Sequence, residues 1–555
     1  MAQLDLTRPG STSIARPMTG ATTSPAPAGG IGPMRARLRR RLGVEHPEPA
    51  WWAWCVALVL GGFAAMLRFW RLGDPPTLMF DETYYVKQAY SLLLSGDVEW
   101  RWTNDSTPPA DDIWNAGTLD VFTREGDPTI VHPPLGKWMI ALGMRVFGPE
   151  DPASWRIASA ICGALMVVIL VLVARRLFDS TLLGGIAGFL LAIDGNHLTS
   201  SRIGLLDIFL AFWALVAFAL LLGDRYWLRA RLADRVAKLT AGGSGPPRYG
   251  PWFVFRPWLL AAGVALGAAS AIKWSGLWFI VAFGLLVVAW DVGARHTAGI
   301  KRWFTAGVLR DGPIAFLHLV PVAFLTYGVT WIGWFRSDDG FNRYWARDNP
   351  DSILARLLPD PIASLAHWHQ AMWQFHVNVT DDHIYQANPW SWLVQGRPTL
   401  FAHQDVSRGQ AGCSADTCKL DVLNVGNPVI WWGGAIAIVI VALVWLLQRD
   451  WRAGAVLVPL AAGWLPWLMY QERTIFNFYS VAFVPYVVLA LTFVLGMLLG
   501  PPGADVRRRT WGAALVGAFV VLATAVFVLF WPMWVYSAMT IERWQLLIWL
   551  PSWRQ

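Results

Sequence analysis

Charged residues are scarce in this sequence. Asp, Glu, Lys and Arg make up only 15% of the 555 residues, whereas 55% are hydrophobic. A water-soluble protein of this length needs a more polar surface, so an array of soluble domains is excluded. Only 4 residues are Cys, which excludes a disulfide-dense scaffold. The high apolar content also excludes a chain that is disordered over most of its length.

Tryptophan and long apolar runs are abundant instead. The 36 Trp residues suit a membrane–water interface, where the ring is apolar and the N–H stays hydrated. The composition therefore predicts an all-α polytopic membrane protein. The net charge of +8 fits basic cytoplasmic loops better than a nucleic-acid partner, because the basic residues are scattered between apolar runs.

Eleven apolar stretches are interpreted as membrane spans: 51–70, 154–174, 181–194, 204–222, 257–272, 274–290, 313–333, 429–447, 453–470, 476–499 and 511–531. A twelfth run, 134–148, is short, follows Pro133 and contains Lys137 and Arg145. If this run is an interfacial helix, every loop assigned to the cytoplasm is basic; if it spans, those loops are all exported. The positive-inside rule therefore favours eleven spans in the plasma membrane, with the N-terminus inside and the C-terminus outside.

This topology divides the chain into four parts. Residues 1–48 are predicted to form a disordered, basic cytoplasmic tail. Residues 49–333 form a membrane module with spans 1–7 and an acidic first outside loop, 71–153. A large second outside loop, 334–428, precedes a C-terminal membrane module, 429–555, with spans 8–11. In the second loop, Cys413 and Cys418 are either two free thiols or, as we favour on the oxidising side of the membrane, a small disulfide loop.

Two adjacent carboxylates, Asp81 and Glu82, follow the first span within the sequence Phe80-Asp81-Glu82-Thr83-Tyr84-Tyr85. Acids among aromatic residues at a bilayer surface are unfavourable unless they are used or solvated, which indicates a functional site. The alternative is an ordinary helix start, where the helix dipole favours acids. The residues alone leave both interpretations open.

Cations at the outer ends of spans form a second candidate group: Arg156, Arg202, Lys273 and Arg473. A single cation there usually extends its charge to the interface, but four on one side indicate a shared anionic ligand, such as a lipid phosphate. His132 and Lys137 flank the Pro133-Pro134 helix start and could face the same anion, or mark only a loop-to-helix junction.

Histidines of the second loop do not have the spacing of a compact zinc site, so no metal site is predicted from His367, His369, His376, His383 and His403. Paired broken helices in an inverted repeat, which would indicate a transporter, are not visible in the sequence.

Taken in order, these motifs resemble the protein O-mannosyltransferases, polytopic glycosyltransferases of the C superfamily. The resemblance is carried by Phe80-Asp81-Glu82, His132-Pro133-Pro134-Leu135-Gly136-Lys137, Arg202 with Leu206-Asp207, Lys273-Trp274, and Arg473 with Phe476 and Tyr479. The stretch from His383 to Trp392 is similar to a second-loop motif of the bacterial branch, although Ile384 stands where Pro is expected. The loop 334–428 is too short for the β-trefoil domain of eukaryotic members, which also favours the bacterial branch.

The resemblance implies a polyprenyl-phosphate-mannose donor and Ser or Thr acceptors in secreted or membrane proteins, with the protein-export channel as a candidate partner. We predict an inverting single displacement in which Asp81 is the base and Glu82 orients either the acceptor or Asp81. The donor phosphate would be held by Arg156, Lys273, Arg473, His132 and Lys137. Further substrate-site candidates are Tyr85, Arg202, Asp207, His383, Tyr385 and Tyr479. No cofactor is required, although a divalent cation is used elsewhere in this superfamily.

Three other functions compete with this interpretation. A related enzyme could transfer a lipid-linked sugar to a glycolipid or polysaccharide. A lipid flippase or transporter would need a polar pathway across the bilayer, yet span centres such as 165–172 and 515–529 are almost wholly apolar. For a purely structural membrane partner, the acidic pair would have no use.

Overall fold

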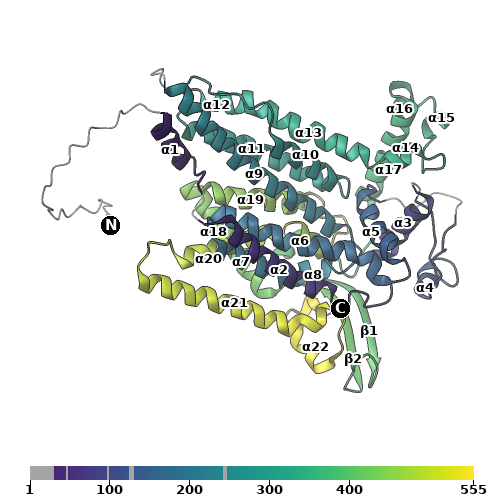
Figure 1. Ribbon diagram of the computed structural model, residues 1–555. Helices are drawn as coiled ribbons and strands as arrows, with labels where there is room; N and C mark the ends of the chain where they lie inside the picture. Colours follow the sequence, from purple (N-terminus) through teal and green to yellow (C-terminus); the bar gives the residue numbers. More distant parts are fainter. Residues whose placement is uncertain (1–30, 46–47, 97–98, 124–130, 242–246, 555) are drawn as a thin grey trace, which may run out of the picture.

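The computed structural model describes residues 31–45, 48–96, 99–123, 131–241 and 247–554. Its long helices run side by side, and the helices of both predicted outside loops gather at one end of the bundle (Figure 1). The N-terminal helix α1 (Ile31–Arg41) and helix α12 (Trp303–Ala306) lie at the opposite end. The arrangement thus places the two large loops on the same side, as the predicted topology requires.

Within these described ranges, eight segments are long and apolar enough to cross a membrane: α2 (Ala50–Phe69), α6 (Pro152–Phe178), α9 (Asp207–Thr240), α11 (Gly276–Thr297), the segment Trp303–Val329 that ends in α13 (Gly312–Val329), α18 (Pro428–Gln448), α19 (Trp451–Trp464) with its extension to Met469, and α21 (Val506–Trp534). Three apolar helices are shorter: α7 (Thr181–Ala192), α10 (Pro257–Ser270) and α20 (Val484–Leu499). Each of the eleven predicted stretches overlaps one of these helices. The all-α membrane fold class is confirmed, and the number of crossings stays a prediction.

Shorter helices build the loops and connections. In the first outside loop and before α9 these are α3 (Glu82–Ser95), α4 (Ala110–Asn115), α5 (Leu135–Phe147) and α8 (Gly195–Ser200). The later ones are η1 (Gly307–Asp311), α14 (Ile332–Arg336), α15 (Trp345–Asp348), α16 (Ile353–Leu357), α17 (Asp360–Asn378), η2 (Pro389–Val394), η3 (Leu465–Met469), η4 (Asn477–Ala482), α22 (Ile541–Leu547) and η5 (Pro551–Trp553). Helix α5 matches the run 134–148. Its 13 residues rise only about 20 Å, against about 30 Å of hydrocarbon.

Helix α9 continues well past the predicted end of its span at residue 222. Its 34 residues extend about 51 Å, which is longer than the bilayer core is thick. The first part of the predicted loop 223–256 is therefore helix. Buried ion pairs fix the neighbouring helices at this end, since Arg256 binds both Asp224 of α9 and Asp291 of α11.

The predicted disordered tail, 1–48, is wrong for residues 31–41, which form α1; residues 1–30 and 46–47 lie outside the described part of the chain. An isolated helix of this length is marginal in water. Here α1 packs on α9: Arg35 Nε donates to Asp234 Oδ1 over 2.7 Å, and the Leu38 side chain is buried. Tertiary contacts, which the local sequence does not reveal, stabilise the helix.

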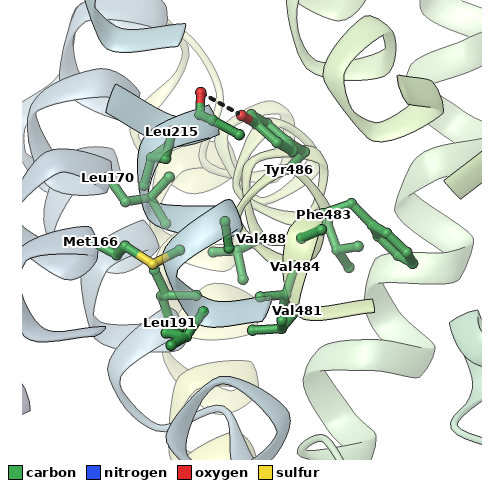
Figure 2. Close-up of a cluster of buried hydrophobic side chains, with 14 of the residues drawn as sticks. Met166, Leu170, Leu191, Leu215, Val481, Phe483, Val484, Tyr486 and Val488 are labelled. Carbon is green, nitrogen blue, oxygen red and sulfur yellow. Dashed lines mark hydrogen bonds between the residues drawn. The ribbon is translucent and has the colours of Figure 1, made fainter. Parts of the chain in front are cut away.

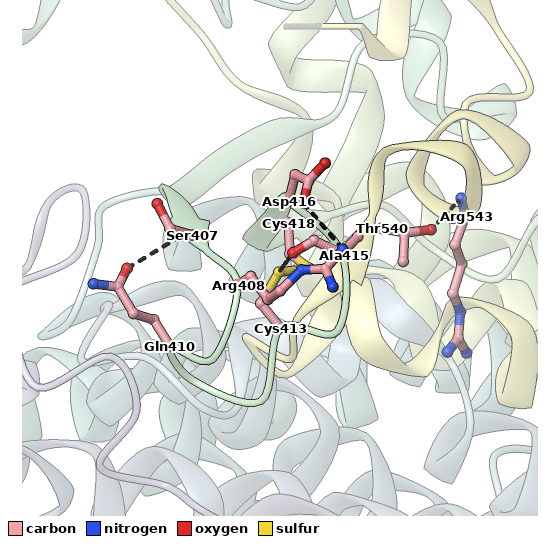
Figure 3. The surroundings of a disulfide bond; sticks show 9 residues. All are labelled: Ser407, Arg408, Gln410, Cys413, Ala415, Asp416, Cys418, Thr540 and Arg543. Atoms are coloured by element: carbon pink, nitrogen blue, oxygen red, sulfur yellow. Dashed lines mark hydrogen bonds and ion pairs between the residues drawn. A yellow bond between two sulfur atoms is a disulfide. The ribbon is translucent and has the colours of Figure 1, made fainter.

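The large loop also contains strands, which the all-α expectation missed. Strands β1 (Thr399–Ser407) and β2 (Thr417–Asn424) pair antiparallel, and β3 (Met539–Thr540) adds to β2. A disulfide between Cys413 and Cys418 closes the turn of the hairpin (Figure 3). In the same turn, the guanidinium of Arg408 forms an ion pair with Asp416. Two strands of eight or nine residues give too short a pattern to stand out in an apolar sequence.

Apolar side chains from α6, α7, α9 and α20 form a close-packed core (Figure 2). Met166, Leu170 and Leu191 have no exposed surface and face Val484 and Val488 of α20. Val481 and Phe483, at the end of η4, belong to the same cluster. Close packing of this kind leaves side chains little freedom, so η4 is fixed relative to the helices that carry the site described next.

Candidate active site

A cavity of about 380 Å³ opens among α9, α11, α17, η3 and η4. Its polar lining consists of His132, Asp207, Lys273, Ser275, His376, Tyr470, Arg473 and Tyr479. The rest is mostly apolar and includes Trp274, Leu277, Trp278, Val281, Trp373 and Trp467. Leu277 and Val281 lie on the first two turns of α11 and are half exposed, so an apolar surface leads from the polar group along a helix that enters the membrane. A phosphate with an apolar tail fits both linings.

The Asp81 carboxylate is close to Lys273 and Asp207 of this cavity, although Asp81 itself is not one of the lining residues. Asp81 is the N-cap residue of α3, yet its side chain makes no capping bond. Within the described part of the chain, the Asp81 carboxylate forms no other hydrogen bond or ion pair. Burial raises its pKa from 3.8 to about 7; the nearby Lys273 lowers the pKa, and Asp207 raises it. Asp81 and Glu82 thus lie at a helix start, as the alternative interpretation expects, but the Asp81 side chain does not cap that helix. A carboxyl group with this pKa suits proton transfer near neutral pH.

Glu82 holds the turn that carries Asp81. Its buried carboxylate forms an ion pair with Arg156, with Nη2–Oε2 at 2.8 Å, and accepts hydrogen bonds from the N–H groups of Gly204 (2.7 Å) and Met79 (2.9 Å). Nε of Arg156 also donates to Glu82, and its Nη1 and Nη2 groups donate to the carbonyls of Leu72, Pro75 and Thr77. Arg156 is thus committed to the protein. The structure does not bring it to the cavity, contrary to the expectation that it binds donor phosphate.

Lys273 and Asp207 form an ion pair within the cavity lining. Lys273 Nζ lies 2.7 Å from Asp207 Oδ2 and 5.0 Å from the ring centroid of Tyr479. Asp207 is the first residue of α9, and Lys273 follows α10. The structure therefore brings together three predicted site residues from separate parts of the chain.

Arg473 has a neutral partner. Its Nη2 donates to His376 Nδ1 over 3.3 Å, while His376 Nε2 donates to the carbonyl of Val131. The His376 ring stacks on that of His132 with centroids 4.6 Å apart. Burial and nearby cations lower the pKa of His376 to about 4 and that of His132 well below its usual value. Within the described chain, Arg473 has no carboxylate partner, so its charge is available to an anion.

His376 is a site residue that sequence reasoning missed. In the sequence, His376 stands out only as one of the second-loop histidines that could suggest a metal site. The available signal is its place on α17, where Met372, Trp373, His376 and Val377 all line the cavity. That spacing marks one face of a helix. Among the described residues, no group of three or more His, Cys, Asp or Glu could hold a metal ion.

Two predicted phosphate ligands or substrate residues lie elsewhere. Lys137 Nζ pairs with Glu99 over 2.8 Å and donates to the carbonyl of His132, with no exposed surface. Arg202 donates to the carbonyls that end α2, those of Leu67, Arg68, Trp70 and Arg71. Both cations satisfy buried groups of the protein itself, which is why they do not reach the cavity.

The remaining candidates surround the Asp81 turn. The ring of Tyr85 lies 5.8 Å from that of His132. His383 and Tyr385 do not line the cavity and instead pack on Phe80, with ring centroids 6.0 and 6.5 Å away.

The fold is similar to that of a solved protein O-mannosyltransferase. The chain superposes on a subunit of the protein O-mannosyltransferase Pmt1–Pmt2 complex of Saccharomyces cerevisiae, solved with bound sugar donor, with a TM-score of 0.69 over 94% of both chains. Sequence identity between them is 15%, so this comparison concerns the fold.

Comparison with known sequences identifies the family. Residues 131–234 match the family model described as dolichyl-phosphate-mannose-protein mannosyltransferase, and residues 361–553 match the C-terminal four-TMM region of protein-O-mannosyltransferase. A polyprenol-phosphate-mannose–protein mannosyltransferase of Mycolicibacterium smegmatis is 36% identical, covering 90% of this chain and 93% of its own length. That of Corynebacterium glutamicum is 35% identical, covering 91% and 93%. The chain belongs to the protein O-mannosyltransferase family, which confirms the resemblance seen in its motifs.

Proposed function

We propose that this mannosyltransferase moves mannose from polyprenyl-phosphate mannose to a Ser or Thr hydroxyl of a protein, with inversion at the anomeric carbon. The names of the bacterial relatives support the donor and the acceptor. The observation that carries the mechanism is the Asp81 carboxylate, which is only partly exposed, has no partner in the described chain and lies close to Lys273 of the cavity that also contains Arg473.

The donor binds through its phosphate at Arg473 and Lys273, with His132 at the same part of the lining. The side chain of Arg473 is the stronger candidate because no carboxylate neutralises it, whereas Lys273 is shared with Asp207. The isoprenoid chain follows the apolar surface along α11. Charge-assisted contacts to phosphate are among the stronger hydrogen bonds in proteins.

Asp81 accepts the hydroxyl proton as the Ser or Thr oxygen attacks the anomeric carbon. The bond between that carbon and the phosphate oxygen breaks on the opposite face, through a transition state that resembles an oxocarbenium ion. The electron pair leaves with the phosphate, whose growing charge is stabilised by the two cations. A phosphate leaving group needs no general acid. Glu82 acts indirectly by fixing the turn.

The reaction takes place at the end of the bundle where the outside loops gather. In the proposed topology this end is the outer face of the plasma membrane, and the N-terminus is cytoplasmic. A lipid donor suits that face because nucleotide sugars are not available there. Acceptors are then secreted or membrane proteins, and the export channel remains an untested candidate partner.

The decisive experiment is transfer by the purified full chain in lipid nanodiscs. Polyprenyl-phosphate [³H]mannose is supplied with a Ser/Thr peptide or, separately, with a glycolipid acceptor. We expect label on the peptide with inverted configuration, and loss of transfer in Asp81→Asn but not in Asp112→Asn, which changes an exposed acid of the same loop. Label on the glycolipid alone would overturn the proposed acceptor. Equal activity of the two variants would overturn the base.

A further inference from the structure

Phe80, the residue before Asp81, has an unusual backbone. Its φ is 47°, in the left-handed region that bulky side chains rarely adopt. Such a conformation persists only where the surrounding structure holds it. Because Phe80 and Asp81 are neighbours, this dihedral angle helps to decide where the Asp81 carboxylate lies.

Aromatic rings surround the Phe80 side chain and form what we call the Phe80 cage. Its five rings, with centroid distances to Phe80, are Phe476 (5.4 Å), Phe401 (5.6 Å), Phe478 (5.7 Å), His383 (6.0 Å) and Tyr385 (6.5 Å). Edge and tilted ring contacts at such distances are favourable. All five rings come from the large loop or from the segment before α20, and none from the first outside loop. The cage therefore joins the Asp81 turn to distant parts of the chain.

The other side of the turn is fixed by Glu82. Its ion pair with Arg156 and its bonds from Gly204 and Met79 are all buried. Asp81 thus lies between two anchored neighbours, while its own carboxylate has no partner in the described chain. Packing at Phe80 and ion pairing at Glu82 replace the hydrogen bonds that would otherwise orient a catalytic carboxylate.

We propose that Phe80 is a positioning residue that holds Asp81 at the cavity through the Phe80 cage. The proposal rests on the proposed function of Asp81 as the base. A displacement of about 1 Å in a reacting group can lower the rate about 100-fold. Loss of the cage should therefore reduce kcat and leave donor binding almost unchanged, because Arg473 and Lys273 are held by other contacts.

Four substitutions separate the ring from the backbone. Phe80→Ala removes the ring, and we expect kcat to fall about 10- to 100-fold with the donor KM within about twofold. Phe80→Gly removes the ring and also relieves the φ constraint. We expect its kcat to fall as much as that of Phe80→Ala. A kcat near that of the unmodified enzyme would show that only the backbone conformation matters. Phe80→Tyr keeps the ring, so its kcat should be well above that of Phe80→Ala. Phe80→Leu, which keeps apolar volume, replaces the Ala variant if that one does not fold.

The pH profile gives a readout that a merely structural role would not change. The charged and titratable groups around Asp81 are Tyr84 and Tyr85 of α3, Asp207 of α9, Lys273 after α10, and Tyr479 of η4. Burial is the largest cause of the raised Asp81 pKa. If the turn loosens and the carboxylate gains water, that pKa falls, and the acidic limb of kcat/KM moves to lower pH.

Tyr90→Ala is the matched control. Tyr90 lies on the same helix and packs on Trp114 and Phe122 with centroid distances of 5.4 and 6.2 Å, away from Asp81. The Tyr90→Ala substitution should leave kcat per folded molecule and the acidic limb of the kcat/KM profile unchanged. Asp81→Asn is measured in parallel. Normal turnover in Asp81→Asn would refute the base itself. An inactive Asp81→Asn together with an unchanged kcat and pH profile in Phe80→Ala would overturn only the positioning role.

Discussion

The guanidinium of Arg473 donates a hydrogen bond to Nδ1 of His376, 3.3 Å away. His376 can accept this bond because its other ring nitrogen donates to the Val131 carbonyl. With a pKa of about 4, caused by burial and by Arg473, the imidazole is neutral at physiological pH. Arg473 therefore gains a fixed direction without losing its charge. An anion in the cavity meets an oriented, uncompensated cation.

Replacing Arg473 by Ala should weaken donor use. A charge-assisted contact contributes about 1.5–3 kcal/mol, so we expect the donor KM or Kd to rise by about 10- to 100-fold. Arg473→Lys should recover only part of this, since an ammonium group cannot present the planar fork of a guanidinium. Titration of polyprenyl-phosphate mannose at fixed peptide concentration measures the effect.

The His376 contribution is tested separately by His376→Phe, which keeps a ring but removes the acceptor. Loss of one hydrogen bond contributes about 0.5–1.5 kcal/mol, which predicts a donor KM raised by about 2- to 10-fold. Arg473→Ala with unchanged donor kinetics would remove Arg473 from the phosphate site.

Arg156 should behave as a folding residue. Removing one member of a buried ion pair typically destabilises a protein by about 3–5 kcal/mol, and both Arg156 and Glu82 have no exposed surface. We expect Arg156→Ala to lower the unfolding temperature in detergent sharply, and any folded fraction to show a normal donor KM. The double variant with Glu82→Gln should lose less stability than the sum of the losses in the two single variants. A raised donor KM in a stable Arg156→Ala variant would restore its role at the phosphate.

Most of the fold could be predicted from the sequence because membrane spans depend on local composition. Every predicted apolar stretch corresponds to a helix. The assignment of α5 to the interface rests on the positive-inside rule and stays a prediction. The parts of the fold that the sequence does not predict depend on tertiary contacts. The helix α1 is stabilised by Asp234, which lies 199 residues from Arg35. In the extension of α9, Asp224 forms an ion pair with Arg256, which directly precedes α10.

The candidate site could be predicted only in part for a related reason. Residue type and position make Asp81, Lys273 and Arg473 candidates, since charges at the outer ends of spans are unusual, and the structure places Lys273 and Arg473 in the cavity lining. They could not distinguish a cation that faces a ligand from one that satisfies buried groups. Arg156 and Arg202 differ from Arg473 only in what the fold places beside them: Glu82 for one, the carbonyl groups at the end of α2 for the other.

The topology makes a prediction at two exposed positions. A reporter inserted after Gln410, at the tip of the β1–β2 hairpin, should be extracytoplasmic, and one after Lys301, near α12, should be cytoplasmic. The basis is the excess of Lys and Arg in every predicted inside loop. Alkaline phosphatase activity at 410 and its absence at 301 are the expected results. The reverse pattern would overturn the predicted topology, and with it the interfacial assignment of 134–148.

Asp81→Asn should abolish most activity without harming the fold. A positioned general base contributes about 10²- to 10⁴-fold to the rate, so transfer per folded molecule should fall by that amount while donor binding persists. Asp81→Glu should also be poor, since one extra methylene displaces the carboxylate. Glu82→Gln should reduce yield more than specific activity. Near-normal turnover in well-folded Asp81→Asn would reject the catalytic assignment.

The raised pKa of Asp81 has opposite consequences for activity and for stability. The base works only when deprotonated, so kcat/KM should rise with pH through about 7 and then level off. In the unfolded chain the same carboxyl ionises near its ordinary value of 3.8. Between these two pKa values the unfolded state binds fewer protons, so this group destabilises the fold increasingly as pH rises. Asp81→Asn removes that effect. Its unfolding temperature should therefore match that of the unmodified protein near pH 4 and exceed it at pH 8, as measured by thermal unfolding in detergent. If the unfolding temperature of Asp81→Asn at pH 8 is equal to or lower than that of the unmodified protein, the folded protein stabilises the charged Asp81 carboxylate. A raised pKa could then not explain the activity of Asp81 as a base.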